Sequence, residues 1–335
     1  MTDGEGVLRW GVIGTGGIAH SFLEAMQETP TGRVTAVGSR SAGRAREFAD
    51  AWGIPVSHGG YAELARDEGV DAVYVATPHP GHHPHTLTCL DAGKHVLVEK
   101  PMAMNALQVA EMVAVARSRG RFLMEAMWTR YLPAYRLARD LVADGMIGRL
   151  CSLSAEFGIS VPFDPDHRLF NTELGGGALL DLGVYPLALA TDFLGELTVV
   201  GATRQLSPDR MVDTHTTVLA RGEGGVSATL SCASRSTMPG RAVLVGTEGW
   251  LELDRTWAPT EVAVHRDGRE PEVFHRPYRG NGYVHEVEEV ARRVAEGRTQ
   301  SPDMPWSESL RLARLMDLVR DVGGFVDEGA EAVAG

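Results

Sequence analysis

The chain has 335 residues, which is long for a single hydrophobic core and favours two domains. Hydrophobic residues make up 44% and charged residues 23%, a composition typical of a globular protein and not of a disordered chain. Acidic residues outnumber basic ones by 44 to 32, and the net charge of −12 disfavours binding to nucleic acid or to an anionic membrane surface.

The cysteines and the N-terminal residues indicate the cellular compartment in which the protein resides. Cys89, Cys151 and Cys232 lie far apart and form no CxxC pair, which is typical of reduced thiols in the cytosol. The first residues carry acids where a secretory signal has basic residues. No uninterrupted apolar run reaches the roughly 20 residues that a membrane-spanning helix needs. We therefore expect a cytoplasmic protein that binds neither membrane nor nucleic acid.

Strand-like and helix-like segments alternate through the first third of the chain. The predicted strands are residues 7–13, 33–39, 71–76, 94–99 and 121–125. The predicted helices include residues 17–28, 44–52 and 106–119, and Asn105 with Gln108 has the spacing of a capping box at the start of the last one. Near-continuous apolar strands between helices are typical of a parallel sheet covered on both faces. The sequence thus predicts a doubly wound Rossmann domain over residues 1–126.

The pattern changes after about residue 147. Strand-like segments then follow one another with few helices between them, at residues 150–157, 197–204, 214–220, 226–233, 241–246 and 261–265. This order is typical of an α+β domain built on a largely antiparallel open sheet. Helical patterns return at residues 284–296 and 307–322. We expect a second domain over residues 127–335 for substrate binding and oligomerisation, with a C-terminal helix that can pack back on the first domain.

A glycine motif follows the first predicted strand and opens a helix. Gly14, Gly16, Gly17 and Ile18 belong to the pattern G-x-G-x-x-A. The first glycine permits a tight turn, and the second lets the backbone approach a pyrophosphate at the helix N-terminus. The alternative is a glycine-rich turn without a ligand, but the strand–turn–helix context favours a dinucleotide site.

The end of the second predicted strand bears on which dinucleotide is bound. An NAD site would have an acidic residue there to bind the ribose 2′-hydroxyl, whereas this strand ends at Ser39 and Arg40, with Arg44 one turn further. An arginine fork can bind a 2′-phosphate bidentately. The sequence therefore predicts NADP rather than NAD, and the alternative is a solvated basic start of a helix.

Four histidines lie within seven residues after the strand at 71–76. Thr77, His79 and His82 open this segment, at the sheet edge where ligands bind in such folds. A metal site is one interpretation, but three prolines and a glycine limit how the imidazoles converge, and the segment has no carboxylate. We predict a wall beside the nicotinamide, with some histidines exposed, and no metal.

Two further groups have side chains suited to proton transfer. Glu99 and Lys100 end the strand at 94–99 at the same sheet edge, and a lysine of lowered pKa can exchange a proton with a substrate hydroxyl. Asp181 and Tyr185 follow a run of three glycines, and on a helix their spacing puts both on one face, although Pro186 should kink that helix. The alternatives are a surface lysine and a capping aspartate with a packed tyrosine. A lysine from the first domain would be a natural partner for Asp181.

Together these motifs resemble the glucose–fructose oxidoreductase/inositol dehydrogenase (Gfo/Idh/MocA) family, and within it the dihydrodiol and D-xylose dehydrogenase subgroup. The residues that carry the resemblance are the glycine motif, the tripeptide 99–101, and the blocks 122–130, 155–158 and 175–185. The resemblance covers essentially the whole chain. A segment at 161–170 departs from the pattern, and we expect it to shape the substrate pocket.

The resemblance implies roles at the matching positions. Lys100, Asp181 and Tyr185 match the catalytic residues, and a histidine in place of Tyr185 would be typical of inositol dehydrogenases. Arg40 and Arg44 match the arginines that bind the 2′-phosphate. Residues expected in the substrate pocket are Trp128, Arg130, Phe157 and His167.

The function expected from these features is hydride transfer between NADP and a secondary alcohol of a sugar, such as D-xylose or D-glucose at C1, or of a trans-dihydrodiol. Lys100 with Tyr185 would act as the acid/base, and Asp181 would hold Lys100 and the substrate hydroxyl. Which of Lys100 and Tyr185 is the proximate base stays open. The alternatives are a ketoreductase of an activated keto-sugar and a regulator that senses NADP or sugar without turnover. The open sheet and the resemblance imply a homodimer or a higher homo-oligomer.

Overall fold

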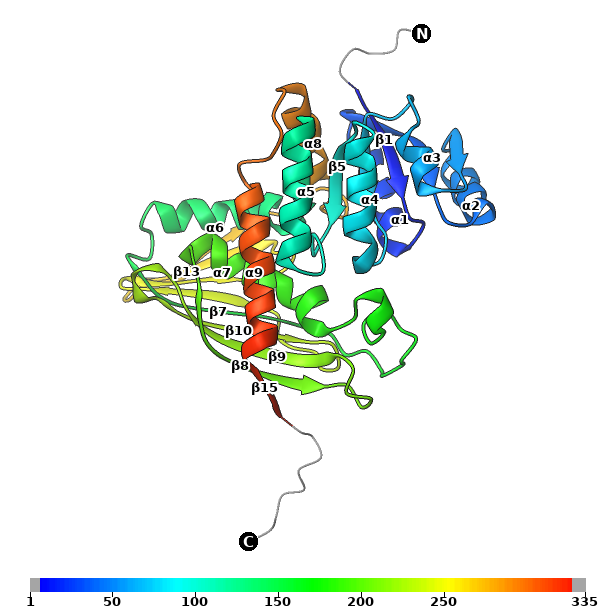
Figure 1. Ribbon diagram of the computed structural model, residues 1–335. Coiled ribbons are helices and arrows are strands. Elements are labelled where there is room, and N and C mark those ends of the chain that lie inside the picture. Colours follow the sequence, from blue (N-terminus) through cyan, green and yellow to red (C-terminus); the bar gives the residue numbers. More distant parts are fainter. Residues whose placement is uncertain (1–6, 327–335) are drawn as a thin grey trace. The chain divides into compact units, whose positions relative to one another are not determined.

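The computed structural model describes the backbone of residues 7–326 and the side chains up to residue 322 (Figure 1). The chain forms two compact units. The first contains the described residues up to Tyr131 and, in addition, the segment Tyr278–Leu310. The second contains Leu132–Pro277 and the chain from Arg311 onward.

The first unit is built on a six-stranded parallel sheet with strand order β3-β2-β1-β4-β5-β6. Its strands are β1 (Leu8–Ile13), β2 (Gly32–Gly38), β3 (Val56–His58), β4 (Ala72–Val75), β5 (His95–Glu99) and β6 (Leu123–Ala126). Every residue of β4 is buried, as expected for a strand covered on both faces. The strand order reverses between β1 and β4, and ligands bind beyond the carboxyl ends of the strands at such a switch point.

Helices connect these strands and complete the unit. They are α1 (Gly17–Gln27), α2 (Ala42–Trp52), α3 (Tyr61–Ala65), α4 (His79–Asp91), α5 (Ala106–Arg119), the 3₁₀ turn η1 (Trp128–Tyr131) and α8 (Val284–Ala295). The helix α8 is distant in sequence but packs on α1. The Thr29 hydroxyl donates to Glu288 Oε1 at 3.0 Å, and the Asn281 side-chain amide donates to the Ser21 carbonyl at 2.8 Å. The last helix, α9 (Trp306–Val322), groups with this unit only as far as Leu310.

The second unit is built on a nine-stranded sheet with strand order β14-β13-β12-β11-β7-β10-β9-β8-β15. Its strands are β7 (Leu150–Gly158), β8 (Thr198–Leu206), β9 (Asp213–Arg221), β10 (Ser227–Ala233), β11 (Ala242–Gly246), β12 (Gly249–Leu253), β13 (Glu261–His265), β14 (Glu272–His275) and β15 (Gly323–Val326). Neighbouring strands are antiparallel except for the pairs β7–β10 and β8–β15. The predicted fold class, a Rossmann domain followed by a largely antiparallel open sheet, is confirmed.

One face of this second sheet is covered by helices. The long ones are α6 (Pro133–Ala143), which packs on β12 and β13, and α7 (Val184–Leu194), which packs on β7 and β10 (Figure 1). Short turns are η2 (Thr172–Leu174), the π-helical turn η3 (Leu179–Gly183) and η4 (Glu223–Gly225). Burial alternates along β9, where Val218 is buried and Leu219 is 47% exposed. The other face of the sheet is therefore accessible within this unit.

The predicted strands and helices lie within two residues of observed ones at each end. No residue range was predicted from the sequence for β3, α3, α4, α6, α7, β12, β14 or β15. The segment Thr172–Leu194 is long and apolar enough to cross a membrane, but 89% of its most apolar window is buried inside the protein. It includes η3 and α7, so the burial reflects packing on the second sheet.

Candidate active site

The glycine motif forms the turn between β1 and α1. Gly14 has φ +104°, and a Cβ there would lie 2.6 Å from the Ala76 carbonyl oxygen, so the protein itself requires glycine. A Cβ on Gly16 or Gly17 would meet no protein atom within 4 Å. Gly16 is the N-cap of α1, and no side chain caps this helix start. The space over these two glycines and the uncapped N–H groups fit a pyrophosphate, which accepts hydrogen bonds from such groups.

The end of β2 presents two arginines to solvent. Ser39 is buried, and its N–H donates to the His58 carbonyl at 3.2 Å. Arg40 and Arg44 are both exposed, and α2 begins between them because the Ser41 hydroxyl accepts from the Arg44 N–H. The described residues around this helix start include no ion-pair partner for either guanidinium. The arrangement leaves both arginines accessible to an anion at the end of β2.

The histidine-rich segment is the start of α4, and His82 lies at its centre. His82 is 1% exposed, and its ring nitrogens lie 2.8 Å from the carbonyl oxygens of Thr77 and Pro101. Burial lowers the pKa of His82 to about 3, although the two carbonyl contacts oppose that shift. The ring therefore links the loop after β4 to the loop after β5, which carries Lys100.

The other histidines of this segment face different partners. The ring of His83 contacts Glu111 at 2.8 Å, and that of His85 contacts the Thr77 hydroxyl at 3.1 Å. The His79 ring lies 5.6 Å from the His82 ring, centre to centre. Throughout residues 7–322, no group of three or more His, Cys, Asp or Glu side chains is arranged to hold a metal ion.

Lys100 directly follows β5 and the buried carboxyl group of Glu99. The Glu99 carboxylate accepts from the Lys100 N–H at 3.2 Å and from the Tyr74 hydroxyl. Burial raises the pKa of Glu99, and the charge of Lys100 opposes the shift. Glu286 on α8 is fully buried, and the described residues offer neither of its carboxyl oxygens a hydrogen bond. Burial and then the charge of Glu99 raise the pKa of Glu286 well above its ordinary value, which favours the neutral acid.

The two pocket residues predicted on η1 are both buried within the first unit. The Trp128 ring stacks on the Tyr283 ring at 4.6 Å and meets Tyr278 edge-on at 6.1 Å. Arg130 is 2% exposed and forms an ion pair with Glu308 at 2.7 Å. A role of Trp128 and Arg130 in the substrate pocket stays a prediction, and the buried ion pair gives Arg130 a structural role as well.

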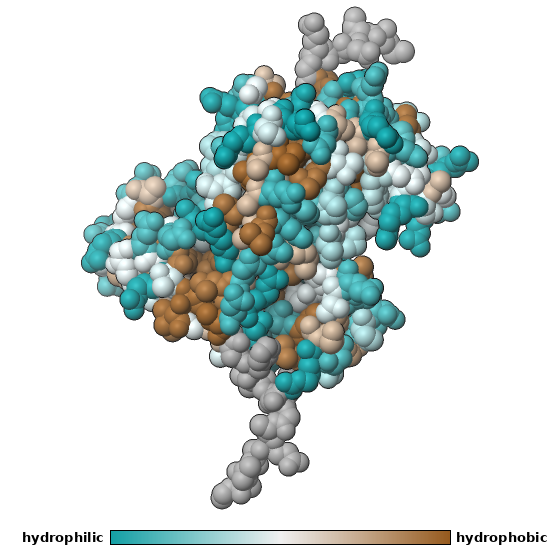
Figure 2. Space-filling view, in the orientation of Figure 1, coloured by the Kyte–Doolittle hydropathy of each residue, from teal (hydrophilic) through white to brown (hydrophobic). Residues whose placement is uncertain are grey.

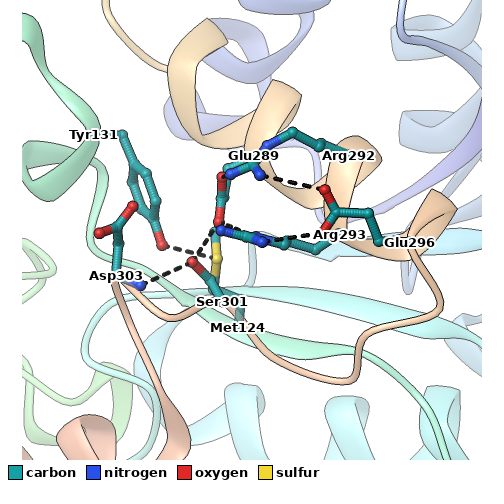
Figure 3. Close-up of polar contacts among 8 residues, drawn as sticks. All are labelled: Met124, Tyr131, Glu289, Arg292, Arg293, Glu296, Ser301 and Asp303. Atoms are coloured by element: carbon teal, nitrogen blue, oxygen red, sulfur yellow. Dashed lines mark hydrogen bonds and ion pairs between the residues drawn. The ribbon is translucent and has the colours of Figure 1, made fainter.

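An ion-pair network lies within the returning segment 278–310 (Figure 3), and the Leu123 N–H of β6 donates to the Thr299 carbonyl of that segment at 3.0 Å. Glu289 on α8 accepts from Arg293 at 2.8 Å and from the Ser301 hydroxyl at 2.6 Å. Tyr131 of η1 lies near Ser301, and its hydroxyl contacts the sulfur of Met124 at 3.0 Å. Arg130 of η1 is joined to the same segment, because its guanidinium donates to the Asp303 carbonyl at 3.2 Å and pairs with Glu308.

In the second unit, Asp181 and Tyr185 lie on consecutive helical segments. Asp181 belongs to the π turn η3 and Tyr185 to the first turn of α7, so the regular α-helical spacing expected for the pair is interrupted. π turns often accompany functional sites. Asp213 on β9 fixes the start of η3, because its carboxylate accepts from the Leu179 N–H at 2.8 Å. A Cβ on Gly177 would lie 2.6 Å from the same carboxylate, which explains the glycine there.

Asp181 has an ionic partner in its own unit. Its carboxylate lies 3.0 Å from Nη1 of Arg168, in the segment 161–170 that we expected to shape the pocket. Arg168 itself was not predicted as a site residue. A contact between Asp181 and Lys100, which lie in different units, stays a prediction.

The remaining predicted pocket residues lie near Tyr185 and in the same segment as Arg168. The Phe157 ring meets the Tyr185 ring edge-on at 5.5 Å and stacks on Trp257 at 4.0 Å. His167 is partly exposed and packs against Phe170, with a centroid distance of 5.9 Å. Trp257 was not predicted, since it follows no motif in the sequence.

The first unit has the architecture of a dinucleotide-binding protein: a 321456 parallel sheet, a glycine turn at the α1 N-terminus and accessible arginines at the end of β2. Comparison with known proteins places it more narrowly. Residues 8–127 match an oxidoreductase family with an NAD-binding Rossmann fold, and residues 135–252 match a GFO/IDH/MocA C-terminal domain. The chain belongs to the Gfo/Idh/MocA family of oxidoreductases, which makes it an enzyme that acts on CH–OH donors.

Relatives of known name agree with this assignment. Trans-1,2-dihydrobenzene-1,2-diol dehydrogenase of Mus musculus is 38% identical over 329 residues, which cover 95% of this chain and 97% of the relative. The Homo sapiens protein of the same name is 37% identical over 330 residues, with the same coverage.

Solved structures give the same picture. A 3-ketoreductase from Actinomadura kijaniata, crystallised with NADP and TDP-benzene, is 33% identical with a TM-score of 0.87, and the match covers 96% of this chain and 99% of the other. An aldose-aldose oxidoreductase from Caulobacter crescentus is 25% identical with a TM-score of 0.86, and the match covers 94% and 97%.

Proposed function

We propose that this enzyme transfers a hydride between NADP and a secondary alcohol or carbonyl of a sugar or a trans-dihydrodiol. The observation that carries the proposal is the open cradle over Gly16 and Gly17 at an uncapped helix N-terminus. Substrates of this class agree with the names of the relatives, which are a dihydrodiol dehydrogenase, a 3-ketoreductase and an aldose-aldose oxidoreductase.

The choice of NADP over NAD rests on Arg40 and Arg44. Both are exposed at the carboxyl end of β2, where the ribose 2′-position of a dinucleotide lies in Rossmann folds. The 3-ketoreductase of similar structure was crystallised with NADP. The proposed cofactor-binding residues are those at the carboxyl ends of β1, β2, β4 and β5: Gly14, Gly16, Gly17, Ile18, Ser39, Arg40, Arg44, Thr77, His79, His82, Glu99 and Lys100.

Replacing both arginines tests this choice. In R40A/R44A we expect kcat/KM for NADP to fall at least about a hundredfold while that for NAD changes little, because each arginine contributes a charge-assisted hydrogen bond of about 1.5–3 kcal/mol to the phosphate. The measurement is steady-state kinetics with each cofactor. R33A, an exposed arginine at the other end of β2, serves as the control. Equal losses with NADP and NAD would contradict a role in recognising the 2′-phosphate.

Proton transfer is assigned to Lys100, Asp181 and Tyr185. In alcohol oxidation, the substrate hydroxyl first donates to Asp181, which orients it, and its proton then passes to Lys100 with Tyr185 as the hydride leaves. Bound NADP supplies the hydride chemistry, and the protein supplies position and proton management. Trp128, Phe157, Arg130 and His167 stay the proposed pocket residues.

The K100M variant tests the assignment. We expect kcat to fall by about 10²–10⁴-fold, the usual contribution of a positioned acid/base, while NADP affinity stays nearly unchanged. Stopped-flow turnover and fluorescence titration of NADPH measure the two quantities. K94M is the control for loss of a lysine in this unit. Lys94 lies next to the start of β5 and donates to backbone carbonyls. Near-normal turnover in K100M would remove Lys100 from the mechanism.

The second candidate function is the reverse reaction on an activated keto-sugar. It is favoured by the 3-ketoreductase likeness over 96% of the chain. Assays in both directions on sugars, dihydrodiols and a nucleotide-linked keto-sugar distinguish the two. Tight NADP binding without turnover of any of them would favour a sensor instead.

Oligomerisation and compartment complete the proposal. Hydrophobic residues reach the surface in patches among hydrophilic ones (Figure 2). On the strands of the second sheet, Leu219, Val245, Trp250 and Val273 are exposed. We propose that a second copy covers the accessible face of this sheet, and a monomeric mass by light scattering would contradict it. The free thiols of Cys89, Cys151 and Cys232 support a cytoplasmic location, which fractionation of cells tests.

A further inference from the structure

Arg168 holds an unusual position beside the proposed catalytic aspartate. Its Nη1 lies 3.0 Å from Asp181 Oδ1, yet the two side chains differ greatly in exposure: 58% for Arg168 and 5% for Asp181. The carboxylate is thus almost fully covered, while the guanidinium beside it reaches solvent. A substrate that approaches Asp181 from solvent on this side meets Arg168 next to it.

The backbone around Arg168 is fixed to the glycine run before Asp181. The Leu169 carbonyl accepts from the Gly177 N–H at 2.9 Å, and Leu169 and Phe170 are each 1% exposed in a small core with Val212. Arg168 therefore projects from an anchored segment, and its guanidinium is held at a defined place.

The pair offers two kinds of polar atom side by side. A carboxylate only accepts hydrogen bonds and a guanidinium only donates them. Two hydroxyl groups on neighbouring carbons place their oxygens at about hydrogen-bond distance from each other, as the paired atoms of Arg168 and Asp181 are. One hydroxyl can donate to Asp181 while the oxygen of the next accepts from Arg168.

We propose that Arg168 is a specificity-determining residue that binds the hydroxyl on the carbon next to the reacting one, so that the substrates are 1,2-diols. This inference rests on the proposed function of Asp181. Two hydroxyl groups on neighbouring carbons are present at C1 and C2 of an aldose and also in a trans-dihydrodiol. Aldoses and trans-dihydrodiols otherwise differ greatly in polarity. The Phe157 and Tyr185 rings, which meet edge-on in the same unit, supply an apolar surface suited to the carbon ring of either compound.

The test removes the hydroxyl and the arginine separately and together. One substrate pair is D-glucose with 2-deoxy-D-glucose, and the other is trans-cyclohex-3-ene-1,2-diol with cyclohex-2-en-1-ol. Each is assayed by NADPH formation with the wild type, R168Q, R168K and the control R241Q. Arg241 pairs with Glu252 at 2.9 Å and is 61% exposed, so it matches Arg168 in pairing and exposure. Thermal unfolding of each variant checks that it is folded.

In the wild type and R241Q we expect kcat/KM for the deoxy compound to be about ten- to a hundredfold lower than for the diol, the effect of a lost hydrogen bond to a charged group. In R168Q the ratio of kcat/KM for the diol to kcat/KM for the deoxy compound should fall close to the ratio of the intrinsic reactivities of the two compounds, because the partner of the second hydroxyl is gone. R168K should keep part of the discrimination, since its ammonium still donates but lacks the fork.

Two results would overturn the inference, and they are distinguishable. If R168Q lowers activity on both members of a pair equally, Arg168 only orients Asp181 and does not bind the second hydroxyl. If the wild type turns over no substrate, the proposed function fails, and the role of Arg168 in it fails as well.

Discussion

Glu125 illustrates how a single residue can link stability to pH. Its side chain lies in β6, 1% exposed, and accepts from the Met102 N–H at 2.9 Å, which anchors the loop after Lys100. Burial raises the pKa of Glu125 to about 7. The folded protein therefore binds this proton more tightly than the unfolded chain. The stability that the protonated carboxyl contributes is present below the unfolded pKa of 4.5 and is lost as the pH rises through about 7.

The E125Q variant should lack this dependence, because glutamine stays neutral. Between about pH 5 and pH 8 we expect the wild type to lose up to about 3 kcal/mol of unfolding free energy relative to E125Q. Urea unfolding at the two pH values measures the difference, and E47Q, at an exposed glutamate of α2, is the control. A constant difference between wild type and E125Q would show that Glu125 does not titrate in this range.

The residues with a local signature were predictable from the sequence. The positive φ and the crowding at Gly14 follow from the G-x-G-x-x-A pattern, which specifies a tight turn. The partners of buried charges were not predictable. Arg130 pairs with Glu308, which is 178 residues away, and no local pattern encodes such a contact. Arg168 lay in a segment that we had singled out, but nothing in the sequence indicated that it contacts Asp181.

At the scale of single elements, the N-cap of α5 determines where that helix begins. Asn105 Oδ1 accepts from the Gln108 N–H at 3.0 Å, and Gln108 Oε1 accepts from the Met104 N–H at 3.1 Å. The contact of Asn105 with the Gln108 N–H is the predicted half of the capping box. The Gln108 side chain binds the N–H group of Met104, one residue before the N-cap Asn105. This helix follows the loop that carries Lys100, so its start supports that loop.

Replacing Asn105 with alanine should lower the unfolding free energy by about 1 kcal/mol, the usual cost of losing an N-cap. N105S and N105D should recover most of it, because both side chains accept from the same N–H group. Thermal unfolding of the three variants measures the effect. If alanine costs nothing, the cap is not what fixes the start of α5.

The elements missed from the sequence are mostly short. β3 has 3 residues and α3 has 5, too few for a hydrophobic period to develop. The π turn η3 was missed for another reason. Its residues are all buried, so the apolar pattern carries no period that would distinguish a π turn from an α-helix. The altered spacing of Asp181 and Tyr185 was therefore visible only in the structure.

At the scale of the whole molecule, the first unit is made from two separate pieces of chain. α8 packs on α1, and the Trp306 indole N–H donates to the Leu123 carbonyl of β6 at 2.9 Å. A local reading of the sequence finds the helix α8 but not the unit to which it belongs, because helix patterns specify an apolar face and not its partner.

A fragment that ends at Tyr131 should therefore fail to fold, whereas the same fragment joined by a flexible linker to residues 278–310 should fold. The first lacks α8, and the buried faces of α1 and β6 would be exposed to water. Circular dichroism and cooperative thermal unfolding of both fragments make the comparison. Cooperative unfolding of the short fragment would contradict the role given to α8.

The return of the chain also has a consequence during translation. Once residue 131 has left the ribosome, the 146 residues of Leu132–Pro277 must still be synthesised before α8 can reach its place. At ordinary elongation rates this takes roughly 7 to 30 seconds. During that interval the Rossmann sheet of the nascent chain has an uncovered apolar surface. We therefore expect chaperones to bind this incomplete unit.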